Sequence, residues 1–130
     1  MFAPRQVFAL SALLLLSACS SSSMDQDRAV GATDAQQQAI ASLRQTYAEG
    51  RFGDVIRQSA RSAELRSAPM AIRVEALKLE AFSYCVTNHR ALCEQQFTRI
   101  LALDPQFELA GAERGHPQWQ PAFDAARKAR

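Results

Sequence analysis

Histidine, lysine and long apolar runs are all scarce in this sequence of 130 residues. The longest apolar run, VFALSALLLL at 7–16, falls well short of the roughly 18 residues that a membrane-spanning helix needs. The net charge is only +2, whereas nucleic-acid-binding proteins usually carry a concentrated patch of basic residues, so we expect no nucleic-acid partner. The length allows one small domain, and 48% hydrophobic and 22% charged residues are ordinary for a folded chain.

The motifs of enzymes and metal sites are also missing. The sequence has no glycine-rich phosphate loop, no nucleophile elbow and no HExxH pair. Cys85, His89 and Cys93 are spaced four residues apart, but a turn expected at Asn88 breaks the single helical face that a metal ion would need. A cysteine nucleophile would need a histidine partner and an orienting group, and the other histidine is His116. We therefore expect no enzyme activity, no metal and no cofactor.

The N-terminus has the features of a secretory signal. Arg5 precedes the apolar run at 7–16, which has the length of a signal-peptide h-region. The run ends in LSAC at 16–19, and small residues before a cysteine at this place resemble the lipobox of bacterial lipoproteins. The resemblance implies a signal peptide at 1–18 and a lipidated Cys19.

The same resemblance implies a location for the mature chain. Residues 19–33 would be a lipidated N-terminus and a flexible tether, and several acyl chains would hold the protein firmly on a membrane. Ser20 follows the cysteine, and by resemblance to enterobacterial sorting this implies the outer membrane, with the domain facing the periplasm. The alternative is an ordinary signal peptide cut after Ser-x-Ala, with Cys19 left as a free thiol.

Apolar residues recur at helical spacing through the rest of the chain, and no segment alternates with the period of a strand. We therefore expect an all-α fold. Asp34 is a good N-cap for the first helix, and Pro105 ends the fourth because the residue before a proline avoids the helical region. The expected helices cover residues 34–49, 53–66, 69–87 and 90–103, with a short one from about residue 121. In the second helix we expect four inward-facing residues: Val55, Ile56, Ala60 and Ala63.

Residues 36–105 contain two related helical hairpins. In the second, the small residues Ala81 and Cys93 alternate with aromatic Tyr84 and Phe97 ahead of LDP at 103–105. The first carries YxxGxFxxVI at 47–56 but lacks the closing LDP. These patterns resemble tetratricopeptide repeats, in which small residues let paired helices approach closely and aromatic residues fill the spaces between them. The resemblance implies two TPR-like antiparallel hairpins at 34–105.

The remaining residues, 106–130, would cap the exposed end of the second hairpin, as repeat proteins require. Four large apolar residues are available for this: Phe107, Leu109, Trp119 and Phe123. The form LDPxFxL…HPxWxPxFxxA resembles an extension of small envelope lipoproteins, some of which lie beside type VI secretion genes.

With Cys19 lipidated, Cys85 and Cys93 remain as a pair. An even number of cysteines in a protein of the oxidising periplasm is typical of a disulfide. The chain reverses between the two residues, so their Cα atoms could approach the ~5.5–6 Å that a disulfide needs. The alternative is two small buried thiols that suit helix packing.

Two further features concern partners. Arg57 and Arg61 are four residues apart and share a helix face, which is either ordinary solvated surface or a shallow basic strip that meets an acidic partner. In the repeat family the first helix of each hairpin lines a concave face, where a peptide helix or strand can lie. The contact candidates on these helices are Gln37, Arg44, Arg73, Glu80 and Ser83. Trp119 either packs on the core or is exposed at a surface that binds a partner.

Together these features predict a lipid-anchored periplasmic adaptor for protein–protein interaction. On resemblance it would be an accessory component of an envelope secretion machine, type VI being favoured. One alternative is a pilotin-like lipoprotein that assists secretin assembly. Another is a structural spacer that self-associates into homo-oligomers.

Overall fold

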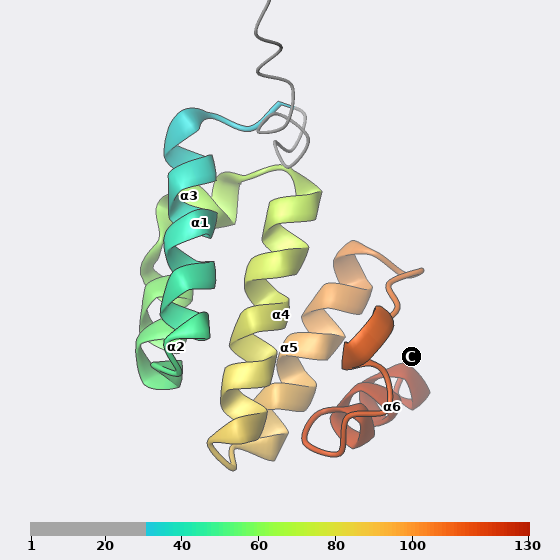
Figure 1. The fold of residues 1–130 in the computed structure, drawn as a ribbon. Helices are drawn as coiled ribbons and strands as arrows, with labels where there is room; N and C mark the ends of the chain where they lie inside the picture. Colours follow the sequence, from blue (N-terminus) through green and yellow to red (C-terminus); the bar gives the residue numbers. More distant parts are fainter. Residues whose placement is uncertain (1–30) are drawn as a thin grey trace, which may run out of the picture.

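The computed structural model describes residues 31–130, and all regular structure in this range is helical (Figure 1). The elements are α1 (Asp34–Ala48), α2 (Phe52–Arg61), α3 (Ala63–Ser67), α4 (Met70–Val86), α5 (Arg90–Leu103), the 3₁₀ helix η1 (Gly111–Glu113) and α6 (Gln120–Lys128). The all-α prediction is confirmed. The expected signal peptide, Cys19 and most of the expected tether lie outside the described residues.

The first helix begins where we expected, but its N-cap is Thr33 and not Asp34. Thr33 Oγ1 accepts a hydrogen bond from the backbone N–H of Gln36 at 3.2 Å, and the N–H of Thr33 donates to Gln36 Oε1 at 3.0 Å. This capping box satisfies two backbone donors, whereas an aspartate cap alone would satisfy one. Asp34 lies in the first turn, where the helix dipole favours a negative charge.

The second expected helix is divided in two. Ser62 leaves the helical conformation, with ψ at 115°, and its hydroxyl accepts a hydrogen bond from the N–H of Leu65 at 3.1 Å, so it caps α3. In α2 the buried residues are Val55 and Ser59, four residues apart, and Ala60 lies about 100° around the helix from Ser59 and is exposed. After the break Leu65 is buried and Ala63 is exposed. The prediction that these two alanines face inward was therefore wrong.

Helix α4 lies at the centre of the fold. It contacts α1, α2 and α3 on one side and α5 on the other (Figure 1). After α4 the chain reverses at Asn88, whose φ of 64° suits a residue that tolerates the left-handed region. The chain then returns as α5, so the turn predicted at this position is confirmed.

Buried apolar side chains form two clusters. The N-terminal cluster consists of Ile40, Leu43, Val55, Leu65, Ala68, Ile72, Ala76 and Leu79. The C-terminal cluster consists of Ala81, Phe82, Cys85, Cys93, Phe97, Ile100, Leu101, Leu109, Trp119, Ala122, Phe123 and Ala126. Because α6 packs on α5, residues 106–130 cover the outer side of that helix. Of the four apolar residues expected there, Phe107 alone is only partly buried.

Candidate functional site

Two ion pairs join α1, α4 and residues 106–130 across one face of the molecule. Arg44 of α1 donates to both carboxylate oxygens of Glu75, with Nε–Oε1 and Nη2–Oε2 distances of 2.5 and 2.7 Å. Lys78 Nζ lies 2.6 Å from Oε1 of Glu113 in η1. Glu75 and Lys78 are three residues apart on α4, so they share a helix face. We call the surface that these pairs span the front face.

A row of aromatic side chains underlies the same face, and its two middle members, Phe82 and Trp119, are 3% and 8% exposed. Tyr47 at the end of α1 lies 6.4 Å from Phe82 of α4, measured between ring centroids. Phe82 stacks on Trp119 at 4.0 Å, and Trp119 stacks on His116 at 3.8 Å. The indole Nε1 donates to the backbone carbonyl of Glu113 at 2.8 Å. The row therefore connects α1, α4 and the C-terminal segment through ring contacts.

These contacts answer the open question about Trp119. Its side chain is 8% exposed and belongs to the C-terminal cluster. A buried tryptophan needs a partner for its N–H, and Trp119 has one. Trp119 therefore packs on the core. It supports the front face through its stacking contact with Phe82 and not as an exposed side chain.

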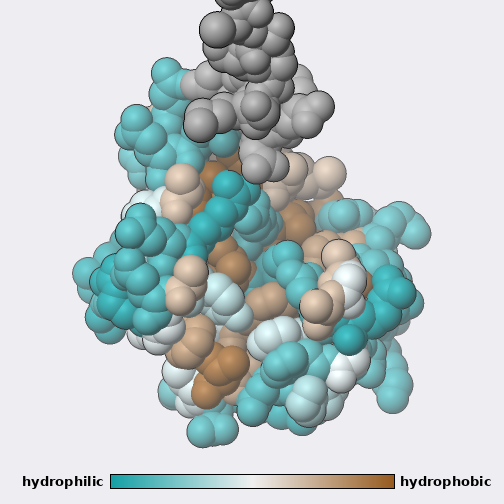
Figure 2. Space-filling view, viewed as in Figure 1, coloured by the Kyte–Doolittle hydropathy of each residue, from teal (hydrophilic) through white to brown (hydrophobic). Residues whose placement is uncertain are grey.

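The front face is apolar along its middle and hydrophilic at its sides. Figure 2, in the view of Figure 1, shows partly buried hydrophobic side chains that reach the surface in a strip between the hydrophilic flank of α1 and that of the C-terminal segment. Burial raises the pKa of the Tyr47 hydroxyl, and the negative charge of Glu113 raises it further. Tyr47 thus stays a neutral hydrogen-bonding group at the edge of an apolar strip.

Two predicted contact residues are not on any exposed face. Glu80 is 5% exposed and Ser83 is fully buried, so the expectation that they lie on an open face, available to a partner, was wrong. The reason is that α2 covers the side of α4 on which they lie: Ser59 Oγ of α2 donates to Glu80 Oε2 at 2.8 Å. Ser83 satisfies its own hydroxyl by donating to the carbonyl of Leu79 at 2.7 Å.

The buried Glu80 has an unusual electrostatic environment. Burial raises the pKa of the Glu80 carboxyl, while the hydrogen bond from Ser59 and the charge of Arg99 act in the opposite direction. Burial also raises the pKa of Tyr84 nearby, and the charge of Glu80 adds to that effect. Glu80 is therefore a titratable group placed between α2, α4 and α5.

The remaining predicted contact residues do not share one face. Arg44 lies on the front face through its pair with Glu75. Arg73 is partly exposed and lies about 200° around α4 from Glu75, so it points away from that face. Gln37 is partly exposed, and its side-chain nitrogen is buried without a hydrogen-bond partner in the described part of the chain.

Cys85 and Cys93 lie at disulfide distance. Their Cα atoms are 5.2 Å apart, and the two residues are 5% and 0% exposed. The reversal at Asn88 brings the end of α4 beside the start of α5, as the sequence indicated. His89 does not join the pair but lies with its Nδ1 3.0 Å from Thr87 Oγ1.

Metal-ligand clusters and membrane-spanning helices are both absent from residues 31–130. No group of three or more His, Cys, Asp or Glu side chains in this range is placed to hold a metal ion. None of its helices has the length and apolarity that crossing a membrane requires.

Sequence reasoning identified Arg44 and Trp119 but missed the other residues that build the front face. Glu75, Lys78 and Phe82 recur at three- and four-residue intervals, and this spacing could have identified them as one stripe of α4. Glu113 lies 35 residues from Lys78, in η1, where the sequence has no periodic pattern, so no local signal predicts their pairing. Comparison with protein-family models, curated proteins and solved structures finds no match for this chain.

Proposed function

We propose that this protein is a lipid-anchored adaptor that holds a protein partner on its front face, on the periplasmic side of the outer membrane. The observation that carries the proposal is the apolar strip between the flanks of α1 and the C-terminal segment (Figure 2), which is supported from beneath by the stacked, buried rings of Phe82 and Trp119 and bordered by two ion pairs. Such a surface offers apolar area in the middle and charges that orient a partner at the edges. Its chemistry is suited to binding and not to turnover.

The composition of the face indicates the kind of partner. A peptide helix or strand that places apolar side chains along the strip would remove that area from water. Polar groups beside those side chains would meet the Arg44–Glu75 and Lys78–Glu113 pairs. Both ion pairs already link separate elements, so the partner would find a surface that needs little reorganisation.

The sequence alone supports the two other parts of the proposal, namely the membrane anchor and the link to a secretion machine. The apolar run at 7–16 and the lipobox-like LSAC at 16–19 support acylation of Cys19. Labelling with radioactive palmitate should mark the native chain and fail to mark the Cys19→Ser variant. The two hairpins support a TPR-like reading of residues 34–105, and the form of residues 103–126 supports an envelope secretion machine, type VI being favoured.

The test is crosslinking in the native cell envelope, followed by purification through a C-terminal tag and mass spectrometry. We expect one component of a secretion machine, other than a secretin, to be recovered with the wild-type chain. Recovery should fall with Arg44→Glu, which reverses a charge on the front face. It should persist with Arg90→Glu, which makes the same change at an exposed residue of α5.

Three outcomes would contradict the proposal. Equal recovery with both variants would show that the partner does not use the front face. Recovery of a secretin would favour the pilotin-like alternative. Recovery of this protein alone would favour the self-associating spacer.

A further inference from the structure

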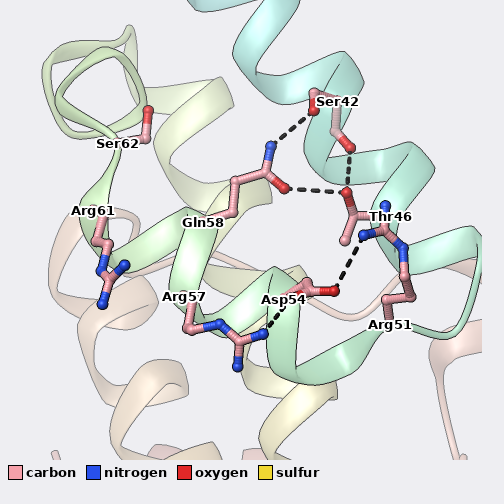
Figure 3. A pocket seen from close by; sticks show the side chains of 8 residues that line it. All are labelled: Ser42, Thr46, Arg51, Asp54, Arg57, Gln58, Arg61 and Ser62. Carbon is pink, nitrogen blue, oxygen red and sulfur yellow. Dashed lines mark hydrogen bonds and ion pairs between the residues drawn. The ribbon is translucent and has the colours of Figure 1, made fainter.

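A polar recess lies between α1 and α2, away from the front face (Figure 3). It has a volume of about 600 Å³ and is open to solvent. Its lining residues are Ser42, Thr46, Arg51, Asp54, Arg57, Gln58, Arg61 and Ser62. Three of these side chains are guanidinium groups and one is a carboxylate, so the lining carries an excess of positive charge.

The single carboxylate of the lining is shared by two of the arginines. Asp54 Oδ2 lies 3.1 Å from Nη1 of Arg51, and Asp54 Oδ1 pairs with Arg57. Arg51 also pairs with Glu49 at 2.8 Å. Arg61 is exposed and has no ion pair within residues 31–130. Arg61 and part of Arg57 are therefore available to an acidic group from outside.

Neutral hydrogen bonds hold the wall of the recess. Gln58 Nε2 donates to Ser42 Oγ at 2.8 Å, and Thr46 Oγ1 lies 3.1 Å from Gln58 Oε1 and 2.9 Å from the carbonyl of Ser42 (Figure 3). These bonds join α1 to α2 and order the wall before any ligand arrives. Because no apolar side chain lines the recess, an apolar peptide or an acyl chain would gain little from entering it.

We propose that this recess is a second interaction surface, which binds an extended acidic segment of a protein through Arg57 and Arg61. A guanidinium group pairs with a carboxylate through two parallel hydrogen bonds, which makes arginine suited to this ligand. The proposal goes beyond the front face, because it concerns the opposite side of α1 and a different kind of ligand.

The spacing of Arg57 and Arg61 favours a peptide ligand in an extended conformation. Residues four apart on a helix are separated by about 6 Å along its axis. In an extended peptide, side chains that point to the same side are two residues apart and about 6.6 Å from each other. Acidic residues at every second position would therefore meet Arg57 and Arg61 in register.

The probe for this proposal is a short fluorescent peptide of repeated Glu-Ser, with a Gln-Ser repeat of equal length as its neutral counterpart. Anisotropy is measured at low ionic strength with the full chain in a non-ionic detergent. We expect the Glu-Ser peptide alone to bind, and Arg61→Gln to weaken binding roughly threefold to fivefold, the scale of one exposed ion pair. Added salt should weaken binding further.

Two variants localise the interaction. Asp54→Asn removes the competing carboxylate and should strengthen binding, because Arg57 and Arg51 lose their internal partner. Arg90→Gln removes an exposed arginine of α5 and should leave binding unchanged. Circular dichroism on heating verifies that each variant remains folded. These variants leave the front face intact, so their result does not depend on that of the crosslinking experiment.

Several results would overturn the proposal. If Arg90→Gln weakens binding as much as Arg61→Gln, the peptide responds to overall charge and not to the recess. If Asp54→Asn weakens binding, the recess does not receive the carboxylates. If phosphatidylglycerol vesicles bind in an Arg61-dependent manner and the Glu-Ser peptide does not, the ligand is a lipid headgroup.

Discussion

The two clusters of the core are built from different side chains. The N-terminal cluster is wholly aliphatic, whereas the C-terminal cluster contains four aromatic residues and both Cys85 and Cys93. Aromatic side chains bury more area each, and their edge contacts add specific geometry. Phe97, for example, meets Phe82 at 6.2 Å and Phe123 at 5.3 Å between ring centroids. The comparison indicates that α4, α5 and α6 form the firmer part of the domain.

Both clusters contain residues of α4, so we expect the unfolding of one cluster to destabilise the other. The part of α4 up to Leu79 supplies Ile72 and Leu79 to the N-terminal cluster, and the part after it supplies Phe82 to the C-terminal one. Tyr47 of α1 packs against both clusters. Helices α1 to α3 therefore depend on α4 being in place, while α4 has a second support from α5.

The largest expected effect comes from removing an aromatic side chain of the C-terminal cluster. Phe97 is fully buried, so Phe97→Ala should lower the free energy of unfolding by about 4 kcal/mol. Leu43→Ala, at a fully buried position of the N-terminal cluster, should cost about 3 kcal/mol. Urea unfolding measures both changes.

Hydrogen exchange separates these two variants more sharply than stability does. With Leu43→Ala, amides of α1 to α3 should lose protection first, while those of α5 keep theirs. With Phe97→Ala, protection should fall in all helices, because α4 loses its firmer support. If Phe97→Ala left α1 to α3 as protected as in the wild type, the proposed dependence on α4 would be wrong.

The second effect concerns the cysteine pair. If Cys85 and Cys93 are bonded in the native chain, reduction should lower the free energy of unfolding by about 2–3 kcal/mol, since the bond restricts the unfolded chain. The measurement is urea unfolding with and without a thiol reductant. The double variant Cys85→Ala and Cys93→Ala should be insensitive to the reductant. Alkylation of both thiols in denatured, unreduced native protein would contradict the bonded state.

Local patterns explain which features the sequence could predict. The apolar spacing marked the helices, and Asn88 marked the reversal that brings Cys85 to Cys93. No glycine or proline marks the break at Ser62 in the sequence. A serine also occurs within helices, so the break could not be predicted without knowing that the Ser62 hydroxyl accepts a hydrogen bond from the N–H of Leu65.

Long-range contacts explain what the sequence could not predict. Glu80 and Ser83 are polar and look solvated in the sequence, because nothing local reveals that α2 covers that side of α4. The recess was indicated in part by Arg57 and Arg61 at helical spacing. Its remaining arginine, Arg51, joins them only through the turn before α2, so the full constellation depends on the fold.

The smallest effect tests the seam between the two regions, where Glu80 of α4 accepts a hydrogen bond from Ser59 of α2 and lies near Arg99 of α5. An unfolded glutamate has a pKa of about 4.3. Burial raises the pKa of Glu80 in the folded chain, so the folded state holds this proton more strongly than the unfolded state. The contribution of Glu80 to stability is therefore largest below about pH 4.3 and declines as the pH rises through the folded-state pKa.

Replacing this carboxyl by an amide should remove that decline. We expect Glu80→Gln to raise the free energy of unfolding at neutral pH by about 1 kcal/mol, because the amide is buried without charge while Ser59 can still donate to it. Urea unfolding across the acidic range gives the pH profile. Glu94→Gln, a matched change at a partly exposed residue of α5, should keep the wild-type profile. If Glu80→Gln instead destabilised the chain at neutral pH, the attraction of Arg99 and the charged hydrogen bond would outweigh burial, and the seam would be a stabilising contact between the regions.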